Sequence, residues 1–468
     1  MAGYQEKIVR GAEAFLKNPK YRPYLESLDK SPLAKARPIL PSDYVALGRQ
    51  FRQFEQYKRW TSEVGTLADL GQLPKIAFDV ITASYGASII PLLASVQPIQ
   101  AQQGIVYFKQ ITALNTRGNV QAGQVLRHAT QMPDVQAIGY ANEMVPQQIG
   151  TTQAGVLEYT ANLTMTPVRE RMTYFYVDDL NMAGLDDGLG NIYGKGFYGT
   201  INYLTGVLNI QFSADPGDGH IIRVEYGTNY EENGQIPKIV SSIATTDIKA
   251  EIFALGTEMG MFKSFEMQRT FGRSADDEVI ADLTQEINAE VGNVLISRIY
   301  AQCKPAVTGQ FITWDAKAPD GVSEKEHKLA FANRIPEAES VLINNAGRGT
   351  ITTLIAGIKA CALFDQIGGF KRTGSGLSGA TLYGTYLDNI AVIRAPRIVA
   401  DNEVICMYKG TSHFDTPAVY APYMPLVVNG SLPVLNNVLK TQGFAAVWSG
   451  MKVVVPNFTT KIVVNNIY

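Results

Sequence analysis

The chain has 468 residues, enough for two or three hydrophobic cores. Hydrophobic residues make up 46% of it and charged residues only 18%, below the roughly 25% typical of soluble domains. This balance indicates a protein that covers part of its surface with other copies of itself. With 41 basic and 43 acidic residues and no basic run, the sequence argues against a dedicated nucleic-acid-binding surface.

The cysteines give no sign of a disulfide framework or a zinc site. Cys303, Cys361 and Cys406 are odd in number, far apart and free of CxxC spacing, which favours a reducing compartment. The N-terminus lacks the continuous apolar core of a signal peptide, and no run of 18 apolar residues occurs. We therefore expect neither secretion by that route nor a membrane span.

The N-terminal part is predicted to be helical. Residues 5–17 and 43–60 have apolar residues at helical spacing, and Ser42 is a candidate N-cap for the second helix. Prolines separate the two segments at Pro32, Pro38 and Pro41. The pattern predicts an extended arm of helices joined by stiff linkers.

A third apolar helical stretch, 76–94, is expected to stop at Pro91. From about 101 to 245 the period changes to alternating apolar and polar residues with frequent glycine, which is typical of β-structure. This β-rich region is predicted to be an insertion or a projecting β-arm. Its clearest strand residues are Ile201, Tyr203, Val207, Ile210, Phe212, Ile221, Val224 and Tyr226.

The strongest predicted helix covers 274–301, with Ser274 as N-cap and acidic residues in its first turn, where the helix dipole favours anions. At 1.5 Å per residue it is roughly 42 Å long, which suits a strut across a domain. Its apolar stripe consists of Ile280, Leu283, Ile287, Val291, Val294 and Leu295.

The C-terminal part mixes both periods. A helix is bracketed by Pro336 at its start and Gly347 just past its end. A strand at 350–356, a short helix and further strands follow up to the C-terminus. The sequence therefore predicts an α+β protein with at least three spatial parts.

Residues 374–379, GSGLSG, match the dinucleotide-binding fingerprint G-x-G-x-x-G, but they follow a short helix and precede a β-like segment. The fingerprint requires a buried strand before it and a helix after it, so a glycine-rich loop is favoured. GNIYGKGF (190–197) departs from the phosphate-binding loop at two positions, and DPGDGH (215–220) is typical of a hairpin turn rather than a calcium loop. No catalytic set, metal site or cofactor site is predicted.

Four segments, in this order, carry a family resemblance. SVQPIQAQQGIVYFKQI (95–111) resembles the point where the arm of T-even-like phage major capsid proteins turns into their extended loop, and 250–291 resembles their helix pair ending in the spine helix. NNAGRG (344–349) and MYKGTSHFDTPAVYAPYMPL (407–426) are similar to the axial-domain end of the same family. Residues 112–249 have no such match.

The resemblance implies the Hong Kong 97-type capsid fold. Its parts would be an N-terminal arm, a helix and transition, an extended loop with a β-rich insertion, a peripheral domain with a spine helix at 274–301, and an axial domain. In chain order these correspond to 1–73, 74–100, 101–249, 250–335 with 435–468, and 336–434.

The same resemblance implies a structural protein of a contractile-tailed double-stranded DNA phage, without catalysis. It would assemble in the host cytoplasm into pentamers and hexamers of an icosahedral head that encloses DNA without binding it specifically. Expected partners are itself, a portal, a scaffold and decoration proteins, with no membrane. The loop with Gly374, Ser375, Gly376 and Gly379 would lie at the capsomer centre, and Ile280, Leu283, Ile287, Val291 and Val294 would pack the spine helix.

Three other functions fit parts of the pattern. An encapsulin-like compartment shares the implied fold, and a tail-sheath protein shares the virion context. A dinucleotide-binding enzyme is the alternative from a different class, and it depends on GSGLSG alone.

Overall fold

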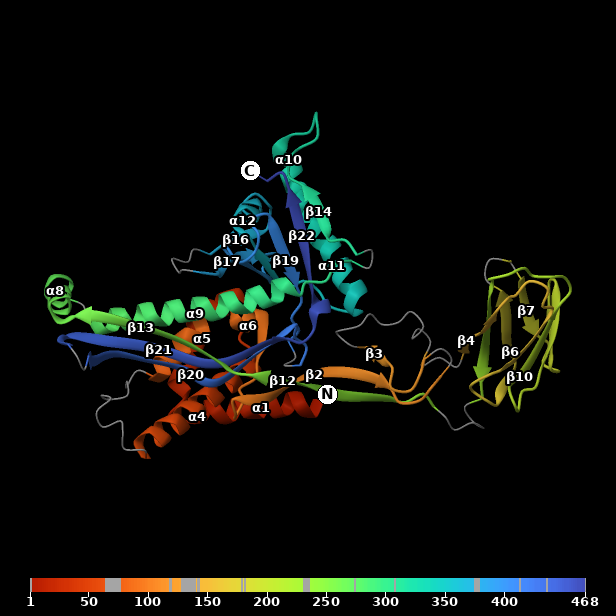
Figure 1. Cartoon of the computed structure of the whole chain (residues 1–468), viewed down its shortest axis with the longest axis horizontal. Coiled ribbons are helices and arrows are strands. Elements are labelled where there is room, and N and C mark those ends of the chain that lie inside the picture. The colour runs from red at the N-terminus through yellow and green to blue at the C-terminus, as the bar shows by residue number, and fades with distance from the viewer. Residues whose placement is uncertain are drawn as a thin grey trace. The chain divides into compact units, whose positions relative to one another are not determined.

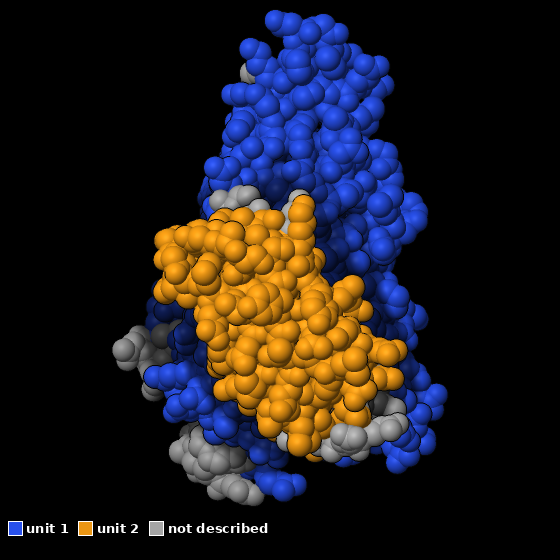
Figure 2. Space-filling view, turned by 90° about the vertical axis from the view of Figure 1, so that its right-hand side faces the viewer, with its two compact units in different colours: residues 1–108, 243–468 blue, residues 109–242 orange. Residues whose placement is uncertain are grey.

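The computed structural model describes residues 2–63, 77–117, 120–127, 140, 144–177, 180, 182–229, 236–272, 275–306, 309–373, 379–411, 414–434 and 437–467. The chain forms two compact units (Figure 2). Unit 1 combines residues 1–108 with 243–468, and unit 2 consists of 109–242.

The N-terminal helices belong to the main core of unit 1, so the prediction of an extended arm is wrong for residues 2–63. Phe15, Leu25 and Phe51 are buried in the same apolar cluster as Ile287. Their side chains gain more from this burial than from staying solvated on stiff linkers. The helices are α1 (Ala2–Leu16), α2 (Arg22–Ser27), η1 (Leu28–Lys30), α3 (Pro32–Ala36) and α4 (Pro41–Glu63).

Prolines start helices here rather than ending them. Helix α4 begins at Pro41, so Ser42 lies inside its first turn and is not the N-cap. Pro91, predicted to stop a helix, instead lies in the first turn of the short helix α6 (Ile90–Leu93), after α5 (Ala77–Ala87) has ended. A proline at a helix start loses no hydrogen bond, because the first amides of a helix have no partner within it.

A four-stranded sheet lies beside these helices, in the order β1-β20-β21-β13. Its centre is the long hairpin of β20 and β21, and β1 pairs with β20 in parallel. The strands are β1 (Ala94–Val96), β20 (Ala418–Val434), β21 (Asn437–Val453) and β13 (Glu251–Gly260).

The predicted helix pair in 250–291 is present as α8 (Met261–Phe271) and α9 (Ala275–Ala301), and the strand β13 that precedes it was not predicted from the sequence. Residues Glu251 to Gly260 pair antiparallel with β21, from Glu251 opposite Ser449 to Gly260 opposite Lys440. The next segment is helical, as α8. Two glycines in ten residues lower the helix propensity of β13, and the adjacent hairpin offers it backbone partners.

Helix α9 (Ala275–Ala301) runs beside the β20/β21 hairpin (Figure 1). Leu283, Ile287, Val291 and Leu295 are buried in the core of unit 1. Ile280 and Val294 are half-buried and pack against the same core, and the predicted N-cap Ser274 lies outside the described residues. One face of α9 therefore packs on this sheet and on α5.

A seven-stranded sheet has its own apolar core, in the order β14-β22-β19-β15-β18-β17-β16. Helix α11 (Arg334–Ala346) begins two residues before Pro336 and ends at Gly347, whose φ of 68° is the left-handed conformation that glycine adopts readily. The other helical elements are α10 (Glu324–Leu329), η3 (Ala330–Asn333), α12 (Ile358–Phe364) and η4 (Pro456–Phe458). The strands are β14 (Ile312–Asp315), β15 (Thr353–Ala356), β16 (Phe370–Arg372), β17 (Thr381–Tyr386), β18 (Ile390–Arg394), β19 (Glu403–Met407) and β22 (Thr459–Asn465).

The two sheets of unit 1 do not follow the sequence boundaries at 335/336 and 434/435. Strands β14 and β22 lie in the seven-stranded sheet, although both fall outside 336–434. Strand β20 falls inside that range but lies in the four-stranded sheet.

Unit 2 is built around an eight-stranded antiparallel sheet in the order β4-β11-β6-β7-β8-β9-β10-β5. Residues 215–220 connect β10 to β11, which are not neighbours, so the predicted hairpin turn at DPGDGH is a loop between separate strands. A smaller sheet in the order β12-β2-β3 contains both points where the chain passes between the units, after Phe108 in β2 and after Ser242 in β12. The strands are β2 (Gln103–Ala113), β3 (Val125–Arg127), β4 (Met144–Thr151), β5 (Glu158–Asn162), β6 (Val168–Val177), β7 (Met182–Asp186), β8 (Asn191–Gly194), β9 (Phe197–Ile201), β10 (Val207–Phe212), β11 (Ile221–Thr228) and β12 (Ile239–Lys249).

The eight-stranded sheet is rolled. Its edge strands β4 and β5 are joined by residues 152–157, which span at most about 20 Å, whereas the edges of a flat sheet of this width would be about 34 Å apart. The Gln147 side chain bridges the two edges: its Nε2 donates to Asn162 O at 3.0 Å, and its Oε1 accepts from the Thr164 amide at 3.0 Å. Between β4 and the end of β5, hydrogen bonds of the Gln147 side chain therefore take the place of the backbone hydrogen bonds that join the other strands of the sheet.

Candidate assembly surface

The reactive side chains of the described residues are buried or isolated. Burial raises the pKa of Cys303 and of Cys361 to about 12 and also raises the pKa of Cys406, so all three thiols stay protonated. Within the described ranges no three His, Cys, Asp or Glu side chains are placed to hold a metal ion. Nor does any helix there have the length and apolarity of a membrane span.

The most unusual charged group is a buried cluster in unit 1. Arg37 donates to both carboxylate oxygens of Asp43, at 2.9 and 3.0 Å, and the Tyr85 hydroxyl donates to the same carboxylate at 3.1 Å. The Leu40 amide also donates to Asp43, at 2.9 Å. Lys409 lies near this pair and donates to the Pro91 carbonyl.

Burial dominates the electrostatics of this cluster. Burial alone would raise the pKa of Asp43, but the hydrogen bonds and charge of Arg37 outweigh it and hold that pKa below its ordinary value. Burial, reinforced by the Arg37 charge, lowers the pKa of Lys409 to about 7 despite the attraction of Asp43. The adjoining cavity of about 20 Å³ has room for roughly one water, so the cluster joins α4, α5 and the segment after β19 rather than receiving a substrate.

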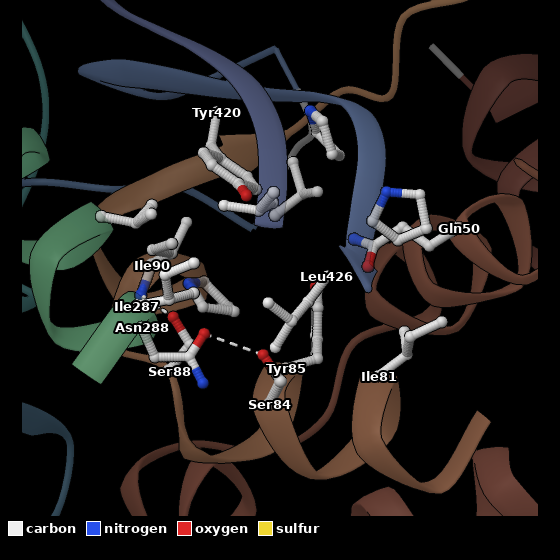
Figure 3. Close-up of a pocket in the computed structure, with 16 residues that line it drawn as sticks. Gln50, Ile81, Ser84, Tyr85, Ser88, Ile90, Ile287, Asn288, Tyr420 and Leu426 are labelled. Carbon is white, nitrogen blue, oxygen red and sulfur yellow. Dashed lines mark hydrogen bonds between the residues drawn. The ribbon is translucent and has the colours of Figure 1, made fainter. Parts of the chain in front are cut away.

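A second cavity lies where α5, α9 and β20 meet (Figure 3). Ser84 Oγ donates to Asn288 Oδ1 across its wall at 2.8 Å, and the ring of Tyr420 also lines it. At about 40 Å³ it holds one or two waters and is far smaller than the pocket of an organic ligand.

The predicted loop site is described only at one end. Gly374, Ser375 and Gly376 lie outside the described residues. Gly379 has φ +76°, and a Cβ added there would lie 2.8 Å from the Cβ of Ala289 on α9. The loop therefore joins β17 through a glycine that both the backbone and the packing require.

The most exposed apolar side chains of unit 1 gather on α8. Phe262 is 73% and Phe265 64% exposed, and Met261 is also exposed. Phe265 is three positions from Phe262 and four from Met261, so its side chain lies next to both of theirs on the helix surface, which we call the α8 face. The resemblance over 250–291 includes this helix but does not say what covers its apolar residues, and the structure shows that they are exposed.

A groove lies between β13 and α9, which are two of the elements that α8 contacts. It encloses about 480 Å³ and has Leu255, Val279 and Leu283 on its apolar walls and Asp282 and Glu286 on its polar side. Strand β13 is the last strand of its sheet, so one of its backbone edges faces outward. An apolar helix face, a groove and a strand edge close together are typical of a surface that another protein chain covers.

Comparison with known proteins gives one family. The model of the major capsid protein Gp23 family matches residues 70–446, which is well over half of the chain. No curated protein sequence is significantly similar to it.

Solved structures of low similarity include three shells. The capsid of jumbo bacteriophage PhiKZ has 10% identity and a TM-score of 0.38, covering 80% of this chain and 91% of that one. The capsid of the myovirus phage XM1 has 7% identity and a TM-score of 0.29, covering 68% of this chain and 88% of that one. A virus-like particle from Pyrococcus furiosus has 12% identity and a TM-score of 0.29, covering 48% of this chain and 80% of that one.

The family assignment rests on the sequence match over residues 70–446. It agrees with the mixed α+β fold of the described residues. The chain therefore belongs to the Gp23 major capsid protein family and is a structural protein of a tailed-phage capsid.

Proposed function

We propose that this chain is the repeating subunit of an icosahedral phage head, with the Hong Kong 97-type fold, and that it assembles as pentamers and hexamers around double-stranded DNA. The family match over 70–446 carries the proposal. Such a subunit is enclosed by neighbours on several sides, and its contacts must close into rings. The low charged fraction of 18% fits a surface that is largely covered in the assembly.

The contact we assign to assembly is the α8 face with the groove between β13 and α9. Phe262 and Phe265 are aromatic side chains of the type that anchors protein interfaces when a partner buries them. The groove supplies apolar walls beside them. A second copy that covers both would remove most of the exposed apolar surface at this end of unit 1.

The proposed parts follow the order of the family. The segment that corresponds in order to the family's N-terminal arm is 1–73, although its described helices pack into the core of unit 1; the transition is 74–100, and the extended loop with its insertion is 101–249. In sequence order the peripheral domain corresponds to 250–335 with 435–468 and the axial domain to 336–434, with β14, β20 and β22 as exceptions because each pairs with the sheet of the other domain. The pairing of β14 and β22 with the seven-stranded sheet supports adding these strands to the axial lobe.

The proposed setting is assembly in the host cytoplasm with a portal and a scaffold, with decoration proteins added on the surface. A near-neutral net charge of −2 suits a capsid that encloses DNA without binding it, because binding to phosphates requires clustered basic residues.

The proposed place of the loop at Gly374, Ser375, Gly376 and Gly379 is the capsomer centre. Glycine adopts backbone angles forbidden to other residues, so it would let one loop close rings of five and six. Replacing Gly374 and Gly376 by valine should then reduce the yield of closed shells, and normal shells from that variant would argue against this placement.

Negative-stain electron microscopy of the expressed chain, with and without a candidate scaffold, tests the function. Uniform polyhedral shells, or rings of five and six, are the expected result. Tubes would indicate a tail protein, and dispersed monomers that bind NAD would indicate an enzyme. A neighbouring portal and maturation protease gene, or their absence, separates a phage head from an encapsulin-like compartment.

A further inference from the structure

An uncovered aromatic row crosses the outer face of unit 2. Tyr174, Leu185, Tyr193 and Tyr198 are between 42% and 63% exposed. Their chain neighbours Phe175, Ile192 and Phe197 are fully or nearly fully buried in the core of the rolled sheet. The alternation along each strand fills the interior with one set of apolar side chains and leaves a second set outside.

Strand register makes these four residues a continuous line. Tyr174 on β6 lies opposite Leu185 on β7, Leu185 lies opposite Tyr193 on β8, and Tyr193 lies opposite Tyr198 on β9. Directly paired side chains on one face lie about 5 Å apart, so the row extends for about 15 Å. We call these four residues the tyrosine row.

Polar side chains continue the line at both ends. Glu225 on β11 is opposite Tyr174, while Gln211 on β10 is opposite Tyr198 and Glu158 on β5 is opposite Gln211. The Tyr198 hydroxyl donates to Gln211 Oε1, which fixes the ring against the amide. A ligand lying along the row would meet flat apolar rings in the middle and hydrogen-bond acceptors at its ends.

The charge of this strip favours a neutral ligand. Its line of paired residues, from Glu225 through the tyrosine row to Glu158, contains two carboxylates and no basic residue. Arg223 and Lys195 are exposed two positions from Glu225 and Tyr193, respectively. Two single basic residues do not form the cluster that nucleic acids and anionic lipids need at a contact.

The area favours a narrow ligand over a protein partner. A fully buried tyrosine hides roughly 150–250 Å², so four half-exposed side chains offer on the order of 400 Å². A stable protein interface takes about 800 Å² from each partner. A linear, neutral chain of sugar units suits this strip, because its CH faces can stack on the rings while its hydroxyls donate to the flanking carboxylates and amide.

We propose that the tyrosine row of unit 2 is a binding site for a linear neutral glycan. Tyr193 and Tyr198 form the central stacking platform, and Glu225 and Glu158 accept hydrogen bonds from sugar hydroxyls at the two ends. This activity is separate from shell assembly, which the preceding proposal assigns to α8 in unit 1.

Isothermal titration calorimetry on the full chain tests this site, with linear hexasaccharides of N-acetylglucosamine and of glucose as probes. We expect saturable binding of at least one hexasaccharide. The double variant Tyr193→Ala with Tyr198→Ala should weaken it at least about tenfold, since each ring stacks on a sugar as aromatic residues stack on bases. Leu189→Ala, at an exposed residue of unit 2 outside the row, is the matched control and should bind like the parent chain.

A variant that keeps an aromatic ring in the row distinguishes loss of the binding site from loss of the fold. Tyr193→Trp enlarges the platform without removing it and should bind at least as tightly as the parent chain. The proposal is overturned if neither hexasaccharide binds the parent chain, or if the double alanine variant binds equally well. It is also overturned if the double variant stays folded but no longer forms shells while Leu189→Ala does, because the row would then be a subunit contact.

Discussion

Asp43 is a carboxylate that holds two buried cations in unit 1. Arg37 donates to both its oxygens, and the Lys409 ammonium is attracted to it from inside the same core. Removing the carboxylate leaves Arg37 and Lys409 buried without their anion, which costs far more than a surface pair.

Asp43→Ala should therefore lower the free energy of unfolding by about 3–5 kcal/mol. Urea unfolding of the unassembled chain measures it. Glu337→Ala, which breaks the exposed ion pair with Arg334, is the control and should cost less than about 1 kcal/mol. Equal losses in the two variants would contradict a buried, coupled cluster.

Lys409 gives the subunit a stability that rises with pH. Its pKa is about 7 in the folded chain, against an ordinary value of 10.5, so between these values the unfolded chain binds one more proton than the folded chain. Folding then gains on the order of 1 kcal/mol per pH unit across this window, and below pH 7 the penalty for the buried ammonium is constant.

Lys409→Met removes this titratable group from both the folded and the unfolded chain. The variant should be more stable than the parent chain near pH 7, and this advantage should shrink as the pH approaches 10. Urea midpoints at pH 7, 8 and 9 test it. A difference that stays constant over this range would show that Lys409 does not titrate in the window.

At the scale of elements, Gln147 closes the rolled sheet of unit 2. Its amide bonds both Asn162 and Thr164 across the edge between β4 and β5. Gln147→Ala leaves those backbone groups to water or to each other, and should destabilise unit 2 by about 1–3 kcal/mol.

Hydrogen exchange of β4 and β5 amides measures this effect within the full chain. Gln147→Glu keeps the acceptor for Thr164 and loses the donor to Asn162, so its loss of protection should be smaller than that of alanine. Unchanged exchange in Gln147→Ala would show that the edges are held by other contacts.

Helices with a one-sided apolar pattern could be predicted from the sequence, whereas elements defined by pairing could not. The stripe of Leu283, Ile287 and Val291 gives α9 almost to the residue, because a helix satisfies its own backbone. Strand β13 was not predicted, since its pairing with β21 joins residues nearly 200 positions apart. The role of Gln147 has no local pattern for the same reason.

At the scale of the whole molecule, the order of the segments was predictable and their packing was not. Four short segments indicated the capsid family, and the match over 70–446 confirms it. The sequence did not show that the N-terminal helices enter the main core, because amphipathic helices have the same pattern whether they pack on their own chain or on a neighbour. The α8 face was missed for the same reason, since a pattern of apolar residues does not say what covers them.

We propose that copies of this chain associate through the α8 face into a shell. Sedimentation velocity under assembly conditions compares the parent chain, Phe262→Ser with Phe265→Ser, and Val322→Ser, which alters an isolated exposed apolar residue. We expect shell-sized particles from the parent chain and Val322→Ser, and folded subunits or small oligomers from the double variant. Shells from the double variant in the same yield as from the parent chain would contradict the claim.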